Sequence, residues 1–91
     1  GEIYSVFTID SDTEVIGNVN KIVMYVITNG AKLILPTAVD NKTIYIVKNL
    51  DTANNLIETD GVETIDGVTS VSIIPFQSIT ITSDNTNYNI N

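Results

Sequence analysis

Short runs of β-branched and aromatic residues alternate along this 91-residue chain with polar breaks. Isoleucine, valine and threonine lose rotamer freedom in helices but pack well on pleated sheets, so the runs predict strands. The breaks contain glycine, proline, asparagine and aspartate, which favour turns. The expected strands are residues 3–9, 14–16, 21–28, 31–35, 43–47, 56–58, 71–74, 77–82 and 88–90.

About eight to ten short strands predict an all-β fold, a small antiparallel β-sandwich or jelly-roll-like domain. Residues 77–82 show the alternation of a half-buried strand, with Ile79 and Ile81 on one face and Ser78, Thr80 and Thr82 on the other. Asn29-Gly30 is a preferred pair for a type I′ turn, because both residues tolerate positive φ. We therefore expect a hairpin that joins residues 21–28 to residues 31–35.

Two of the expected strands, residues 22–27 and 44–47, are apolar on both faces. A short helix would also fit the first run, but its β-branched content and the following Asn-Gly pair favour a strand. Such strands lie either between two layers or against another copy of the chain. We favour the second explanation, since small β domains gain stability by assembling. The residues predicted for the subunit interface are Val23, Tyr25, Ile44 and Ile46.

Composition excludes several kinds of chemistry. The chain has no cysteine and no histidine, so a Ser-His-Asp or Cys-His nucleophile and an ordinary zinc site are excluded. Four lysines against eleven carboxylates give a net charge of −7, which disfavours nucleic acid and anionic membranes as partners. No apolar run reaches the roughly 18 residues that insertion into a membrane needs.

Three weaker alternatives use the polar residues that remain. A carboxylate pair for glycoside hydrolysis is open by composition, although so short a chain is unsuited to a deep cleft. Asp60, Glu63 and Asp66 crowd one loop and suit calcium, but their spacing is not that of an EF-hand, so we expect no metal and no cofactor. Asn85, Asn87 and Tyr88 form a candidate glycan contact, unless Tyr88 packs in the core.

An Asp-Gly-Val triplet occurs twice, at Asp60 and at Asp66. Two Asp-Gly pairs this close predict two successive turns with a very short strand between them. Two copies are too few to predict a solenoid.

Four short motifs follow one another in the second part of the chain: Leu-Pro-Thr-Ala at 35–38, Tyr-Ile-Val-Lys-Asn at 45–49, Glu-Thr-Ile-Asp-Gly at 63–67 and the run from Ser78 to Tyr88. In this order they resemble a β-rich domain of tailed-bacteriophage fibres, tail appendages and related virion spikes. The resemblance covers about residues 33–88. Two positions depart from that pattern: Asn85 stands where glycine is usual, and Tyr88 where tryptophan is usual.

This resemblance implies a non-enzymatic structural module of a virion, forming a homotrimer in a fibre or other external appendage. It also implies a role in attachment to a glycan or protein of the host cell surface. We expect residues 1–91 to be a single β domain cut from a longer fibre protein, since the chain begins with Gly1. The alternative is a monomeric carbohydrate-binding module for cell-wall glycans.

Overall fold

The computed structural model describes residues 5–91, which form β-strands and no helix. The strands lie in two mixed sheets around one hydrophobic core, so the all-β prediction is confirmed. Sheet 1 has the order β1-β3-β5-β8-β9 and sheet 2 the order β2-β4-β6-β7. The strands are β1 (Ser5–Ile9), β2 (Thr13–Glu14), β3 (Ile22–Ile27), β4 (Leu33–Ile34), β5 (Ile44–Asn49), β6 (Asn55–Glu58), β7 (Ser70–Ile73), β8 (Ser78–Ser83) and β9 (Tyr88–Ile90).

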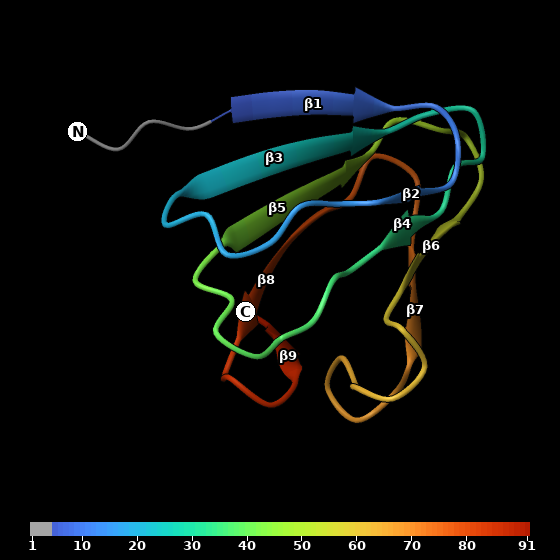
Figure 1. The fold of residues 1–91 in the computed structure, drawn as a ribbon. Helices are drawn as coiled ribbons and strands as arrows, with labels where there is room; N and C mark the ends of the chain where they lie inside the picture. Colours follow the sequence, from blue (N-terminus) through green and yellow to red (C-terminus); the bar gives the residue numbers. More distant parts are fainter. Residues whose placement is uncertain (1–4) are drawn as a thin grey trace.

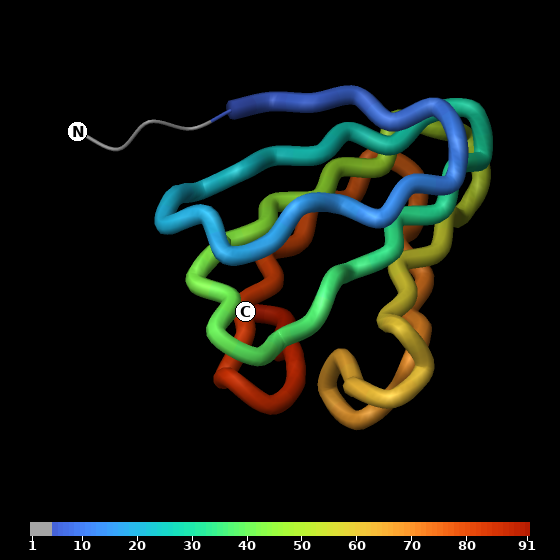
Figure 2. The backbone as a smooth tube through the Cα atoms, viewed as in Figure 1, coloured from blue at the N-terminus to red at the C-terminus, as the bar shows by residue number. Residues whose placement is uncertain are grey.

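From β1 to β6 the chain winds like a short coil, passing alternately through sheet 1 and sheet 2 (Figures 1 and 2). Each strand therefore pairs in parallel with the strand one full turn later: β1 with β3, β3 with β5, β2 with β4, and β4 with β6. After β6 the direction reverses, and β7, β8 and β9 add antiparallel pairs. The predicted antiparallel pairing is therefore wrong for β1 to β6, whereas two sheets around one core are compatible with the predicted β-sandwich.

The predicted hairpin between β3 and β4 is also wrong. Asn29 and Gly30 do have positive φ, 58° and 68°, as a type I′ turn requires. However, β1 and β5 already occupy both edges of β3, so the chain turns out of sheet 1 and enters sheet 2 as β4. The turn is a corner between two sheets, because the pairing of a strand depends on its neighbours as well as on its turn.

Alternation along the strands places the core between the sheets. In β3 the side chains of Val23, Tyr25 and Ile27 are buried, and those between them are only partly buried. In β8, Ile81 is fully buried and Ile79 packs against the core, whereas Thr80 and Thr82 alternate with them, as predicted. The strand expected over residues 3–9 is described from Ser5 onward, and its first two residues lie outside the described part.

Candidate interaction surface

The outward side of sheet 1 carries a patch of aliphatic side chains. The register places Val6 beside Met24 and Met24 beside Ile46, so one row of outward residues crosses three strands. A second row joins Ile22 to Ile44. Val6 is 57% exposed and the others are partly buried by their neighbours. This surface, called the outer face of sheet 1, consists of Val6, Ile22, Met24, Val26, Ile44 and Ile46.

The outward side of sheet 2 has a different character. Lys32 and Glu58 form an ion pair there, with 2.9 Å between the ammonium nitrogen and a carboxylate oxygen. The two side chains are 35% and 31% exposed, and the Glu58 carboxylate raises the pKa of Lys32. Glu14 lies beside Ile34 on the same side, and Ser72 beside Leu56. The outward side of sheet 2 therefore mixes charged and polar residues with Ile34 and Leu56, and it is less apolar than the outer face of sheet 1.

The four predicted interface residues do not share a surface. Val23 is 0% and Tyr25 4% exposed inside this chain, so their assignment to a subunit interface is wrong. Their side chains point to the opposite side of the sheet from those of Ile22, Met24 and Val26, which face outward on β3. Ile44 and Ile46 do lie on the outer face of sheet 1, and their place in an interface remains a prediction. The sequence shows two apolar faces on β3 and contains no signal for which one turns inward.

Tyr88 packs in the core, the favoured alternative for this residue, so its candidate role as a glycan contact is wrong. It is 0% exposed, and its ring packs edge-on against Tyr45 with centroids 6.3 Å apart. The Tyr88 hydroxyl donates to the Pro36 carbonyl at 2.7 Å and accepts from the side-chain amide of Asn41 at 2.9 Å. Burial raises the pKa of Tyr88 above its ordinary range. The hydroxyl therefore stays protonated and acts as a structural hydrogen-bond donor.

The other two predicted glycan contacts fix loops. The side-chain oxygen of Asn85 accepts from the Asp40 amide at 2.6 Å, and that of Asn87 accepts from the Thr64 amide at 2.8 Å. Asn85 has φ of 78°, which is a left-handed conformation. Asparagine tolerates this conformation, so it can stand at the position where the resembled pattern has glycine. Each side-chain oxygen is therefore already used in holding one loop against another.

These loops bring the four sequence motifs together at one end of the molecule, around Tyr88. The Glu63 carboxylate accepts from the Ala38 amide at 2.9 Å, which joins the third motif to the first. Ser83 donates its hydroxyl to the Ala38 carbonyl, which joins the fourth motif to the first. Tyr45 of the second motif accepts from Asn41, as Tyr88 does. The motif residues are hydrogen-bonding partners that close this end of the fold.

The three carboxylates considered for calcium accept hydrogen bonds from backbone amides in different parts of the fold. Asp60 accepts from the amides of Val62 and Glu63, and these bonds lower its pKa. Glu63 binds the amide of Ala38, while Asp66 accepts from the amide of Ile90. Within residues 5–91 no group of three acidic, histidine or cysteine side chains is arranged to hold a metal ion.

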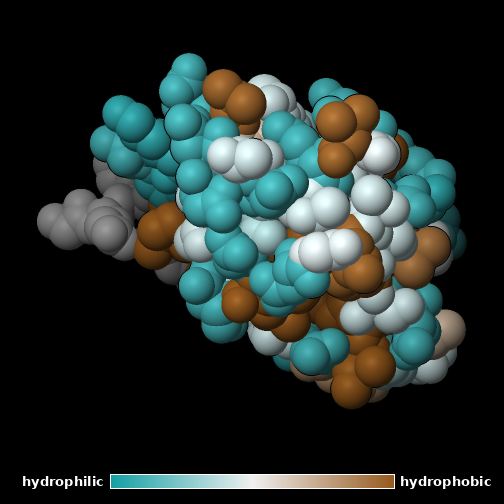
Figure 3. All heavy atoms as spheres, turned by 90° about the horizontal axis from the view of Figure 1, so that it is seen from below, coloured by the Kyte–Doolittle hydropathy of each residue, from teal (hydrophilic) through white to brown (hydrophobic). Residues whose placement is uncertain are grey.

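Exposed hydrophobic side chains also occur away from the strands. Figure 3 shows the face seen from below in Figure 1, where hydrophobic side chains gather in one area among hydrophilic ones. Val62 is 85% and Val68 50% exposed in the segment between β6 and β7. Neither sits in a strand, so they lack the flat shape and fixed spacing of the outer face of sheet 1.

Comparisons with protein-family models, with curated proteins and with solved structures find no match to this chain. In the part of the chain that the structure describes, no helix is long and apolar enough to span a bilayer.

Proposed function

We propose that this chain is a non-enzymatic structural module of a phage virion fibre or other external appendage, assembled as a homotrimer. The observation that carries the self-association is the outer face of sheet 1. Its six aliphatic side chains project from β1, β3 and β5, which are adjacent strands. Contiguous apolar patches of this kind mark interaction sites on soluble proteins.

The charges favour another copy of this chain as the occupant. The chain carries a net charge of −7, which opposes most contacts between copies. On the outer face of sheet 1, the outward positions of β1, β3 and β5 include no carboxylate, and Lys48 is their one charged residue. Two negatively charged copies can therefore meet at this face without bringing carboxylates together.

The virion assignment rests on the sequence resemblance. Residues of these motifs, together with Asn41, make the hydrogen bonds around Tyr88, which supports treating the motifs as parts of one structural unit. In this proposal the end around Tyr88 is a rigid cap, and the outer face of sheet 1 joins the subunits. Attachment to a host glycan or protein belongs to the loops, and binding of the labelled protein to bacterial cells tests it.

The variant Ile46→Asp tests the subunit contact. Ile46 lies at the centre of the outer face of sheet 1, between Met24 and Thr80. A carboxylate buried there without a partner costs several kcal/mol, so the trimer should dissociate into folded monomers. The matched control is Leu56→Asp, which places the same charge on the outward side of sheet 2, where Leu56 is 40% exposed.

Sedimentation velocity gives the mass of each variant, and circular dichroism its fold. We expect a monomer for Ile46→Asp and a trimer for both Leu56→Asp and the unmodified chain. A trimer that survives Ile46→Asp, or one that Leu56→Asp dissociates equally, would contradict the assignment of this face.

A further inference from the structure

We infer that the end of the molecule formed by β1 and β2 is a docking site for an extended segment of a partner protein, flanked by basic residues. β1 is one of the two edge strands of sheet 1 and β2 one of the two of sheet 2, so among the described residues this end of the coil has no strand paired beyond it. It is separate from the subunit contact proposed above, because it uses strand edges and the opening between the sheets.

On the outer edge of β1, the backbone N–H and C=O groups of every second residue are free to pair with another strand. The Thr28 amide donates to the Ile9 carbonyl at 2.9 Å, so the backbone of Ile9 faces β3. Because backbone groups alternate along a strand, the N–H and C=O of Val6 and Thr8 face the opposite way. In the part of the chain that the structure describes, no strand lies on that side.

β2 offers one further residue in the same way. The amides of Thr13 and Val15 donate to the carbonyls of Lys32 and Ile34, at 3.0 and 2.9 Å. The backbone groups of Glu14, between them, therefore face away from β4. The edge of β1 also lacks the usual protection against pairing, since Ser-Val-Phe-Thr-Ile contains no charged residue and no proline.

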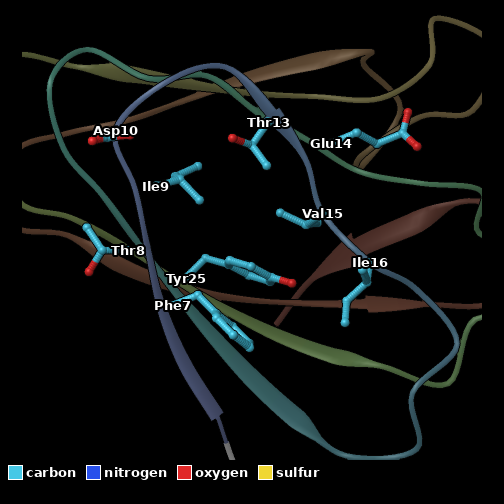
Figure 4. Close-up of a pocket in the computed structure, with 9 residues that line it drawn as sticks. All are labelled: Phe7, Thr8, Ile9, Asp10, Thr13, Glu14, Val15, Ile16 and Tyr25. Carbon is cyan, nitrogen blue, oxygen red and sulfur yellow. The ribbon is translucent and has the colours of Figure 1, made fainter.

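Between the two edges lies an apolar hollow of about 340 Å³. Figure 4 shows the rings of Phe7 and Tyr25 stacked at its floor, with centroids 5.7 Å apart, and Val15 pointing into it from the opposite segment. Phe7 is 47% and Ile16 55% exposed, so these side chains remain partly uncovered. A strand paired with β1 would place every second side chain over this hollow.

The carboxylates near the hollow indicate which kind of partner segment would bind there. Asp10 and Glu14 lie at the rim of the hollow, with Glu14 directed away from its centre in Figure 4, and Asp12 lies between them in the chain. The one ion pair in the described residues, Lys32–Glu58, involves none of these three carboxylates, although Asp12 accepts from the Lys32 amide at 2.9 Å and lies close enough to raise the pKa of Lys32. A second copy of this chain would bring the same carboxylates together, whereas lysine or arginine beside an apolar strand would complement them.

The test uses the whole chain and a synthetic peptide, acetyl-Lys-Thr-Phe-Thr-Ile-Thr-Val-Lys-amide. Strand addition draws its affinity from main-chain hydrogen bonds and its specificity from alternate side chains. We expect the peptide to bind and to shift the NMR amide signals of Val6, Thr8 and Glu14. N-methylation of alternate peptide amides should weaken binding at least about tenfold, because it removes donors while the protein is unchanged.

Two further comparisons test the edge and the charge. Thr8→Pro removes one outward N–H at an edge where proline is tolerated, and Thr8→Val keeps that N–H. We expect the peptide to bind Thr8→Val but not Thr8→Pro, and a peptide flanked by glutamate to bind at least about tenfold more weakly.

Three results would overturn the inference: no binding at millimolar peptide, binding that N-methylation and Thr8→Pro leave unchanged, or equal binding of the glutamate-flanked peptide. Loss of self-association in Thr8→Pro would instead assign this edge to a second copy of the chain, and so would also overturn it.

Discussion

At the scale of single residues, buried polar side chains organise the end of the fold around Tyr88. Asn41 is 7% exposed, and its side-chain amide donates to the hydroxyls of both Tyr45 and Tyr88. Its side-chain oxygen accepts from the amides of Asn18 and Thr43. No buried side-chain nitrogen or oxygen in the described residues lacks a partner. Such a network is stable as a unit, and removal of one member leaves the others unpaired.

Tyr88→Phe tests this network. The change keeps the ring but removes a hydroxyl that bonds the Pro36 carbonyl and the Asn41 amide. We expect the free energy of unfolding to fall by about 1–3 kcal/mol, because buried partners lose a hydrogen bond. Urea unfolding followed by fluorescence measures the change. An unaltered midpoint and slope would show that the hydroxyl has no structural role.

Phe76 occupies a strained position in the turn between β7 and β8. It has φ of +63° directly after Pro75, and the Gln77 amide closes the turn on the Ile74 carbonyl at 3.1 Å. The left-handed conformation costs an ordinary L-residue about 1–2 kcal/mol. Its ring is 57% exposed and so contributes little burial in return.

Phe76→Gly should therefore raise the free energy of unfolding, by about 0.5–1 kcal/mol after the greater flexibility of glycine in the unfolded chain is subtracted. Thermal and urea unfolding measure the gain. Phe76→Ala is the control, since it removes the ring but keeps the strain, and it should not stabilise the protein. Equal stabilisation by both variants would contradict strain as the cause.

At the scale of elements, the corners between the sheets hold successive turns of the chain together. Asp51, after β5, accepts from the amides of Asn29 and Gly30 at 2.9 and 2.8 Å. The side chain of Asn29, after β3, donates to the carbonyl of Asp10, after β1, at 3.1 Å. One corner therefore links three consecutive turns of the chain.

The Asp51 carboxylate makes this corner sensitive to acid. Hydrogen bonds from the Asn55 side chain and the Gly30 amide lower the pKa of Asp51 below its ordinary value of 3.8. Because the pKa is lower in the folded state, these bonds contribute their full stability at any pH above the ordinary pKa of 3.8. That stability is lost as the pH falls through the lower pKa of the folded state, where Asp51 takes up a proton. Asp51→Asn should therefore unfold more easily at pH 7 and lose less stability between pH 5 and 2. Urea midpoints across this range measure the difference, and parallel curves for the two proteins would contradict it.

The sequence predicts the strands better than their pairing. Runs such as Ile22–Ile27 and Ile44–Asn49 are visible because β-branched residues mark them, and their observed ends lie close to those expected. Parallel pairing of β3 with β1 and β5 depends on contacts across a full turn of the chain, which no local pattern encodes. Asn29-Gly30 shows the limit, since its turn conformation is local but the strand that follows it is placed by the core.

The same limit applies to the candidate site. β3 and β5 are apolar on both sides, which predicts that one side packs against something outside the core. Only the fold shows that Val23 faces the core and Ile46 faces outward. The asparagines around Tyr88 leave an exposed position open in the sequence, although an aromatic residue in a closing strand favours the core. Its burial follows from Pro36 and Asn41, which lie about fifty residues earlier in the chain.

At the scale of the whole molecule, the two outward sheet surfaces differ in the cover they need. Sheet 2 presents the Lys32–Glu58 ion pair, and sheet 1 presents aliphatic residues on three adjacent strands. Both sheets pack on one core, so their outward sides differ although their inward sides share the same environment. The self-association that we propose would cover the aliphatic side of sheet 1.

The mass of the unmodified chain in solution tests this account most directly. Sedimentation equilibrium over a range of micromolar concentrations should give three times the 9.9 kDa of one chain. A mass of 9.9 kDa at every concentration, with the outer face of sheet 1 open to solvent, would contradict the account.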